Sequence, residues 1–148
     1  MNRIARTTTG VLAAVAGSAA LAFAAAPAAS AAPVSICPSL PGQTSTAEDC
    51  SAVSGPTGLT LAITLNDGTA TVTGDNFSGP AAIAIGEGAT VNMEGIRPGL
   101  SIGIAGPGAE VTVDGENRVR CEDGMSFAGD FQTWSGCFND GMNEIPLG

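Results

Sequence analysis

Residues 63–74 read ITLNDGTATVTG, residues 83–95 read IAIGEGATVNMEG, and residues 102–115 read IGIAGPGAEVTVDG. Each block starts with two aliphatic residues separated by one residue, passes through a turn that contains glycine, and ends in an alternating run that closes on glycine. Alternation with a period of two is typical of a β-strand with one buried face, and glycine supplies the positive φ that tight turns need. We therefore expect each block to form a strand, a turn and a second strand.

The blocks recur at nearly constant intervals. Ile63 and Ile83 are 20 residues apart, Ile83 and Ile102 are 19 apart, and Gly95 and Gly115 are again 20 apart. A repeat of about 20 residues lies within the range of known solenoid repeats. The sequence therefore predicts an all-β fold, namely a short parallel β-solenoid of about three coils in which equivalent residues stack from coil to coil.

An antiparallel β-sandwich built from three hairpins is the alternative fold. The turn at residues 66–68, Asn-Asp-Gly, is typical of a hairpin and favours this alternative for the first block. We favour the solenoid because the linkers also match: residues 75–77, 96–97 and 116–119 each follow the closing glycine of a block. Corners that stack on one another need such a match, whereas hairpins do not.

The second and third blocks resemble coils of parallel β-helix proteins, in which Ile-x-Ile, Gly-x-Gly-Ala-x-Val and a closing glycine recur. That architecture includes polysaccharide lyases, which use calcium bound by acidic residues and an arginine base. Within the corner at residues 96–99, Arg97 is the best match for such an arginine. Those enzymes have many more coils and a long groove, so the resemblance implies at most a fragment of one.

The N-terminus has the three parts of a secretory signal peptide. Arg3 and Arg6 give a positive start, residues 11–26 form an Ala-rich apolar run, and small residues at 29–31 follow Pro27. The run is shorter than the roughly 20 residues that a membrane span needs. We therefore expect export with cleavage after residue 31. The product would have no membrane span and would be secreted, either extracellular or associated with the cell envelope.

All four cysteines lie in the exported part, and an even number in a small oxidised domain predicts two disulfides. Of three possible connectivities we favour pairing of sequence neighbours, Cys37 with Cys50 and Cys121 with Cys137. Each bridge would close a short loop and stabilise the fold by about 3 kcal/mol. The gaps are too wide for the paired cysteines of a zinc site.

These features divide the chain into four segments. They are a signal peptide at 1–31, an N-terminal cap at 32–58, a β-repeat core at 59–119 and a C-terminal cap at 120–148. A solenoid needs caps at its open ends, and each predicted disulfide lies in one of the two caps.

The exported part is strongly acidic. Its three basic residues, Arg97, Arg118 and Arg120, face all 14 acidic residues, which gives a net charge of −11. This charge excludes a basic nucleic-acid footprint. The whole chain lacks Lys, His and Tyr, so a His-based triad, a His metal site and a Schiff-base lysine are also excluded.

The C-terminal segment carries a set of aromatic residues, Phe127, Phe131, Trp134 and Phe138. Their spacing fits one face of a helix, but Gly129 and Gly136 argue against a stable helix. We expect this stripe to pack onto the last coil as part of the cap. The alternative is an exposed platform for a sugar ring or a partner protein. On that alternative the candidate ligand-binding residues are Trp134, Phe131 and Arg97.

No metal or other cofactor is expected. The turns at residues 66–68, 122–124 and 139–141 offer oxygen ligands, but none has the pattern of a calcium loop. Asp and Asn before Gly are ordinary turn chemistry. An exposed coil end could stack on another copy, so a dimer remains open.

The whole exported chain resembles small secreted actinobacterial proteins of unknown function, without a diagnostic motif. The sequence predicts a non-catalytic β-rich protein that acts through its surface on an unknown partner in or near the cell envelope. The alternative is a carbohydrate-active module, either a glycan-binding domain that uses Trp134 or a lyase remnant that uses Arg97.

Overall fold

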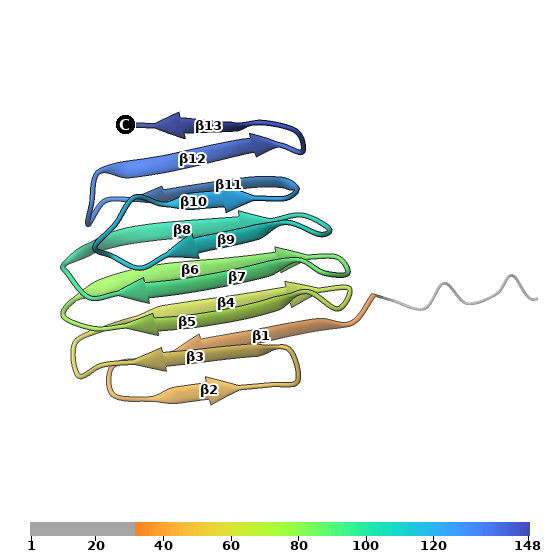
Figure 1. Cartoon of the computed structure of the whole chain (residues 1–148). Coiled ribbons are helices and arrows are strands. Elements are labelled where there is room, and N and C mark those ends of the chain that lie inside the picture. Colours follow the sequence, from red (N-terminus) through yellow and green to blue (C-terminus); the bar gives the residue numbers. More distant parts are fainter. Residues whose placement is uncertain (1–31) are drawn as a thin grey trace, which may run out of the picture. The chain divides into compact units, whose positions relative to one another are not determined.

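The computed structural model describes residues 32–148, and the predicted signal peptide lies outside the described residues. This part of the chain folds into two β-sheets and contains no helix (Figure 1). In order across the seven-stranded sheet the strands are β1 (Val34–Ser39), β4 (Thr60–Leu65), β6 (Ser78–Ile85), β8 (Gly99–Ala105), β11 (Met125–Asp130), β12 (Ser135–Asp140) and β13 (Glu144–Leu147). In order across the six-stranded sheet they are β10 (Arg120–Glu122), β9 (Glu110–Val113), β7 (Thr90–Gly95), β5 (Thr69–Gly74), β3 (Cys50–Ser54) and β2 (Thr44–Thr46).

The middle of the chain forms stacked coils. From β3 to β9 successive strands alternate between the two sheets, and neighbours within each sheet run parallel. One coil adds 20 or 21 residues, since Leu61 lies opposite Ala81 and Ala81 lies opposite Ile102. The predicted parallel β-solenoid is therefore confirmed. The three-hairpin sandwich is wrong, because β4 and β5 lie in different sheets and do not pair.

The register differs from the predicted one in the third coil. Ile83 lies opposite Ile104, 21 residues further along, and not opposite Ile102. The turn between β6 and β7 is one residue longer than that between β4 and β5. In addition, β8 offers aliphatic residues at three alternate positions, so the sequence alone could not show which of them continues the stack.

The turn at residues 66–68 is a coil corner and not a hairpin. Asn66 and Asp67 have φ values of 53° and 63°, the left-handed conformation that Asn and Asp tolerate well. Corners bond to the corners above and below: Gly86 N–H donates to Leu65 O at 2.8 Å, and Gly108 N–H donates to Glu87 O at 3.0 Å. Of the linkers that match in the sequence, residues 75–77 and 96–97 are stacked corners, where Asp75 N–H donates to Gly95 O, whereas residues 116–119 join β9 to antiparallel β10 and leave the stack.

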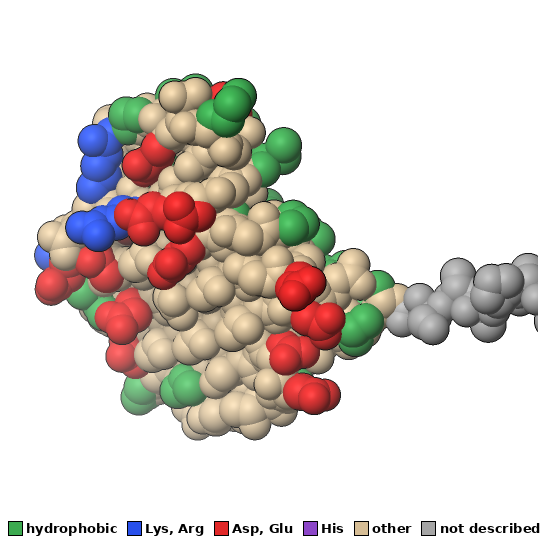
Figure 2. Space-filling view, turned by 45° about the vertical axis from the view of Figure 1, so that its right-hand side comes forward, with side chains coloured by type: hydrophobic (Ala, Val, Ile, Leu, Met, Phe, Trp, Pro, Cys, Tyr) green, Lys and Arg blue, Asp and Glu red, His purple; other side chains and the backbone are tan. Residues whose placement is uncertain are grey.

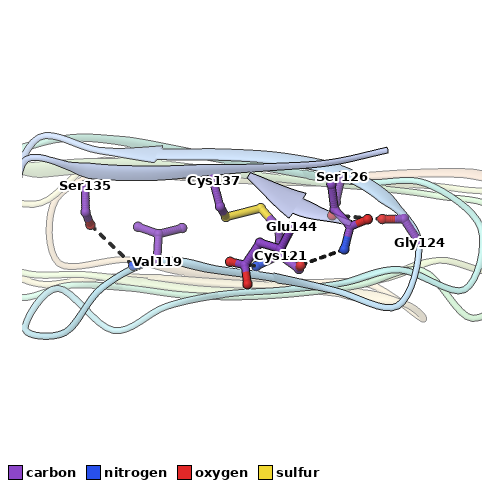
Figure 3. The surroundings of a disulfide bond; sticks show 8 residues. Val119, Cys121, Gly124, Ser126, Ser135, Cys137 and Glu144 are labelled. Atoms are coloured by element: carbon purple, nitrogen blue, oxygen red, sulfur yellow. Dashed lines mark hydrogen bonds between the residues drawn. A yellow bond between two sulfur atoms is a disulfide. The ribbon is translucent and has the colours of Figure 1, made fainter. Parts of the chain in front are cut away.

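Antiparallel strands close both ends of the stack. At one end β1 pairs with β4 and β2 with β3; at the other β10 pairs with β9, and β11, β12 and β13 follow β8. Each end carries a disulfide that joins the two sheets. The predicted pairing is confirmed, as Cys37 bonds to Cys50 and Cys121 to Cys137. Figure 3 shows the second bridge, between β10 and β12.

The interior between the sheets is thin. The bridged cysteines hold their Cα atoms 6.1 Å and 5.8 Å apart, whereas packed sheets commonly lie about 10 Å apart. One inward row of the seven-stranded sheet runs Cys37, Ala62, Ala82, Gly103, Ala128, Cys137. An inward row of the six-stranded sheet runs Cys50, Ala70, Val91, Val111, Cys121. Each row begins and ends with a bridged cysteine.

Small residues are required in this space. A Cβ added at Gly103 would lie 3.0 Å from a methyl carbon of Val91 and 3.0 Å from one of Val111. Ala62 and Ala82 are fully buried. The isoleucines and leucines of the seven-stranded sheet alternate with these small residues, so they point outward, away from the six-stranded sheet.

Candidate apolar binding face

The outward side of the seven-stranded sheet carries a continuous row of large apolar side chains. Direct cross-strand neighbours run through all seven strands in the order Ile36, Ile63, Ile83, Ile104, Phe127, Phe138, Ile145. We name this set the apolar row. The end members are well exposed, at 59% for Ile36 and 48% for Ile145, and the isoleucines of β4, β6 and β8 are half-buried by their neighbours.

Further apolar residues flank the row on both sides. Val34, Leu65 and Ile85 lie beyond it toward one end of the strands, and Leu61, Ala81 and Ile102 lie toward the other end. Leu100, Met125 and Leu147 complete the surface, which we name the apolar face. A patch of this extent is uncommon on a monomer unless it binds something.

Charged residues avoid this face. Strands β1, β4, β6 and β8 contain no charged residue. In the remaining strands of the sheet Asp130 is buried, and Glu144 reaches toward the six-stranded sheet, where it accepts a hydrogen bond from Cys121 N–H at 3.3 Å. Only Asp140, opposite Met125 at the end of β12, points outward at the margin.

The outward side of the six-stranded sheet has the opposite character. Its corresponding polar row runs Thr46, Ser51, Thr71, Asn92, Thr112, Arg120 through all six strands. Glu94, Glu110 and Glu122 occupy neighbouring outward positions. In Figure 2 tan atoms, which are uncharged polar side chains and backbone, dominate the centre of the view, and acidic side chains (red) lie on both sides of it.

Two shallow apolar hollows lie on the apolar face, and both border Phe127. The first, of about 220 Å³, is formed mainly by Phe127, Gly129, Phe131, Trp134, Gly136 and Leu147. The second, of about 290 Å³, is formed mainly by Ile85, Ile104, Gly106, Met125, Phe127 and Phe138. Gly129 and Gly136 lie opposite each other. A Cβ on Gly129 would meet nothing within 4 Å, so the first hollow exists because these positions lack side chains.

Phe131 and Trp134, two of the predicted site residues, come together beside the first hollow. Their ring centroids lie 5.7 Å apart at an interplanar angle of 86°, and Trp134 is 76% exposed. Phe127 and Phe138 lie opposite each other on β11 and β12, also exposed. The expectation that the aromatic stripe packs onto the last coil is therefore wrong. The residues lie on strands and a turn, and the thin interior has no room for them.

Arg97, the third predicted residue, lies at the corner between β7 and β8. Its backbone N–H donates to Gln132 Oε1 at 2.9 Å, which ties this corner to the turn that carries Phe131 and Trp134. Buried Asp130 holds that turn, because its carboxylate accepts hydrogen bonds from Gln132 N–H and from the Thr133 hydroxyl. The structure thus joins the Arg97 backbone to the aromatic turn through the Gln132 side chain.

Exposed carboxylates take part in turn formation. The pKa of Asp114 lies below its ordinary value, mainly because the Asn117 side-chain amide donates to it, helped by backbone N–H groups of Asn117 and Glu116. The pKa of Asp140 is lowered by the backbone N–H groups of Asn143 and Met142. Within residues 32–148 no three His, Cys, Asp or Glu residues cluster as metal ligands would.

A larger polar hollow of about 450 Å³ lies near the free edge of β10, lined by Asn117, Arg118, Val119, Arg120, Glu122, Glu144 and Pro146. Its charged groups are of both signs, so it has no clear preference for an anion or a cation.

Sequence reasoning missed the apolar face as a site. The alternation was visible, but it did not show which set of residues points inward. The signal that could have shown it is the strictly small partner set, Ala62, Ala82 and Gly103, between the larger aliphatic residues.

No helix in the described part of the chain is long and apolar enough to cross a membrane. No protein-family model, curated protein or solved structure matches this chain.

Proposed function

We propose that this protein is an extracellular, non-catalytic domain that works by association through its apolar face. The observation that carries the proposal is the apolar row, which crosses all seven strands of the sheet. Four of these strands, β1, β4, β6 and β8, contain no charged residue. The two disulfides support an oxidising compartment. The predicted signal peptide supports export to it, in or near the cell envelope.

The outward isoleucines add little to the fold itself. The isoleucines of β4, β6 and β8 are only half-buried on their own sheet, whereas the inward rows are fully buried between the two sheets. Covering apolar surface is favourable by about 25 cal/mol for each Å² removed from water. Partner binding to this face would therefore gain free energy that folding has left unused.

The chemistry of the hollows favours an apolar partner. Asp130 and Ser135, polar residues at the first hollow, already bond within the protein: Asp130 to Gln132 and Thr133, and Ser135 to Val119 N–H and Thr133. The second hollow is lined by aliphatic, aromatic and methionine side chains and by Ser126, whose hydroxyl already donates to Gly124 O. A ligand that needs many hydrogen bonds would find few free partners here.

Fractionation tests this function. The full chain and its Ile83→Thr, Ile104→Thr variant are expressed in a Gram-positive host and measured in the medium, the washed envelope and the salt- or detergent-stripped envelope. We expect the parent to stay on the envelope in high salt and to leave with detergent, and the variant to appear in the medium. The matched control is Thr71→Ser, Asn92→Thr on the polar row.

The same envelope retention for the parent and the double variant would overturn the proposal. Thermal melting of each secreted protein shows that it is folded. A loss of envelope retention is then caused by the altered apolar face and not by unfolding.

A glycan-binding role is the second candidate, favoured by the exposure of Trp134 and its edge-on contact with Phe131. Aromatic surfaces of this kind can stack on a sugar ring. Trp134 is the only tryptophan, so its fluorescence reports directly on such binding. No change in emission on titration with envelope glycans, in the parent protein, would exclude this role; unchanged glycan degradation by Arg97→Ala would exclude the lyase version.

A further inference from the structure

We infer that the occupant of the apolar face is a second copy of this chain, so that two molecules pack their seven-stranded sheets against each other around a twofold axis. This inference rests on the proposed function, because it takes the apolar face as the working surface. It goes further by naming the partner that covers this face in solution, in competition with the envelope.

The size of the face suits a dimer. Strands lie about 4.8 Å apart and rise about 3.3 Å per residue, so seven strands of four to eight residues, about six on average, cover roughly 29 Å by 20 Å. Side-chain relief makes the accessible surface larger than this flat area. A standard stable interface buries about 800 Å² on each partner, which is the scale that one whole face can supply.

Charge selects the face for self-association. The described part of the chain carries a net charge of −11, so two copies repel each other over most orientations. The apolar face is the surface where strands β1, β4, β6 and β8 present no charge at all. Two copies can meet there without burying an unpaired carboxylate, since Asp140, the outward carboxylate, lies at the margin and accepts hydrogen bonds from Met142 N–H and Asn143 N–H.

The two halves of the face differ in relief. The β1 side presents exposed aliphatic side chains, with Val34 at 54% and Ile36 at 59%. The β11 to β13 side contains the first hollow, and the second hollow spans β6, β8, β11 and β12. A twofold axis parallel to the strands and above β8, the middle strand of the seven, places β1 of each copy over β13 of the other and the second hollow, which includes Ile104, next to the axis.

This axis also predicts which residue meets its own copy. Ile104, the member of the apolar row on β8, lies nearest to the axis and would contact Ile104 of the second molecule. In such a self-complementary contact a single substitution acts twice.

The strand edges do not offer a competing route to self-association. Pro38 lies on edge strand β1 and Pro146 on edge strand β13, and proline cannot donate to an added strand. Edge strands β2 and β10 are three residues long, and Glu144 already accepts from Cys121 N–H on β10. Stacking of coil ends, the dimer that the sequence left open, is therefore disfavoured by the structure.

The test is the oligomeric state of the secreted, disulfide-bonded protein, measured by sedimentation equilibrium over micromolar concentrations. We expect twice the mass of one chain for the parent and a single mass for Ile104→Glu, which places two carboxylates at the axis. The matched control Asn92→Glu adds the same charge to the polar row and should stay dimeric. Circular dichroism confirms that each variant retains its strands.

Salt gives a second readout. Contact between uncharged faces of two acidic molecules should tighten as salt screens their net repulsion, whereas an association held by ion pairs would weaken. A parent that stays monomeric at the highest concentration overturns the inference, and so do a control that dissociates as fully as Ile104→Glu and particles that grow beyond two chains.

The two proposals fail separately. A monomeric parent whose envelope retention is lost in Ile83→Thr, Ile104→Thr excludes the second copy but keeps the apolar face as a binding surface. A dimeric parent whose retention is indifferent to those substitutions keeps the second copy and removes the envelope role.

Discussion

The two outward faces of this solenoid are built on the same coils and have opposite chemistry. The polar row is made of Thr, Ser, Asn and Arg, and the apolar row is made of Ile and Phe. In β5 the larger apolar residue, Val72, points inward and threonines point outward; in β6 Ala82 points inward and Ile83 points outward. Alternation alone therefore does not tell the inside of a sheet from the outside.

The difference teaches that the distance between the sheets decides which residues are core. A disulfide at each end of the stack holds the two sheets close together. One sheet must therefore supply Ala and Gly so that the valines of the other sheet fit between them. The larger aliphatic residues of that sheet then have only the outer surface to occupy. The four predictions that follow test this comparison, from the largest expected effect to the smallest.

Removal of the second disulfide should have the largest effect on stability. Cys121→Ser, Cys137→Ser opens a loop with a sequence separation of 16, and a loop of about this size is worth about 3 kcal/mol. We expect the free energy of unfolding, measured by urea denaturation, to fall by about that amount. Cys37→Ser, Cys50→Ser opens the other bridge and is the matched comparison. A negligible loss in both double variants would show that the bridges do not hold the sheets.

Enlarging an inward residue should cost somewhat less. Gly103→Val places a Cβ 3.0 Å from methyl carbons of both Val91 and Val111, and overpacking of a tight interior costs about 1–3 kcal/mol. The control Ile102→Val changes the adjacent outward position on the same strand. Equal melting temperatures for the two variants would contradict the thin interior.

An outward substitution should separate stability from binding. Ile83→Thr keeps a β-branched residue on β6 and removes apolar surface from the apolar row. Since the position is not packed against the other sheet, we expect unfolding of the isolated chain to change by less than about 1 kcal/mol, as for ordinary surface sites. Ala82→Ser, the adjacent inward position, serves as control. Association measured by sedimentation should weaken in Ile83→Thr and not in Ala82→Ser. A larger loss of unfolding free energy in Ile83→Thr than in Ala82→Ser would show that the apolar row is core.

Acid should act on the corners and the polar side and have the smallest effect on stability. Hydrogen bonding, first from the Asn117 side chain, lowers the pKa of Asp114 below its unfolded value of 3.8. The carboxylate therefore stabilises the fold at pH values above 3.8, and that stabilisation is lost as pH falls through the folded pKa. A nuclear magnetic resonance titration should show the lowered pKa in the parent and a return toward 3.8 in Asn117→Ala. An unchanged value in that variant would remove Asn117 as the cause.

The coil architecture and the disulfide pairing were predictable because both follow from spacing. The glycine-closed blocks repeat at about one coil length, and cysteines 13 and 16 residues apart close local loops. The register beyond the second coil was not predictable, since Leu100, Ile102 and Ile104 offer equivalent alternation on β8.

The candidate site was predictable only in part. Phe131 and Trp134 were named as exposed only on the alternative to a packed aromatic stripe; the structure places both beside one turn, with Arg97 at a neighbouring corner. The apolar face was not predictable, because its members come from seven strands spread over more than a hundred residues. Their assembly depends on the sheet order and on the separation between the sheets, and neither property is written in any one segment.

The register of 20 or 21 residues per coil makes the chain modular in an evolutionary sense. Duplication of one coil would insert one strand into each sheet while leaving both disulfide-bonded ends unchanged, and it would lengthen the apolar row and the polar row by one residue each. Lineages could in this way change the area of the face, and with it the strength of association, through gene length instead of through point substitution. Relatives that differ in length by multiples of about one coil would be the trace of such a history.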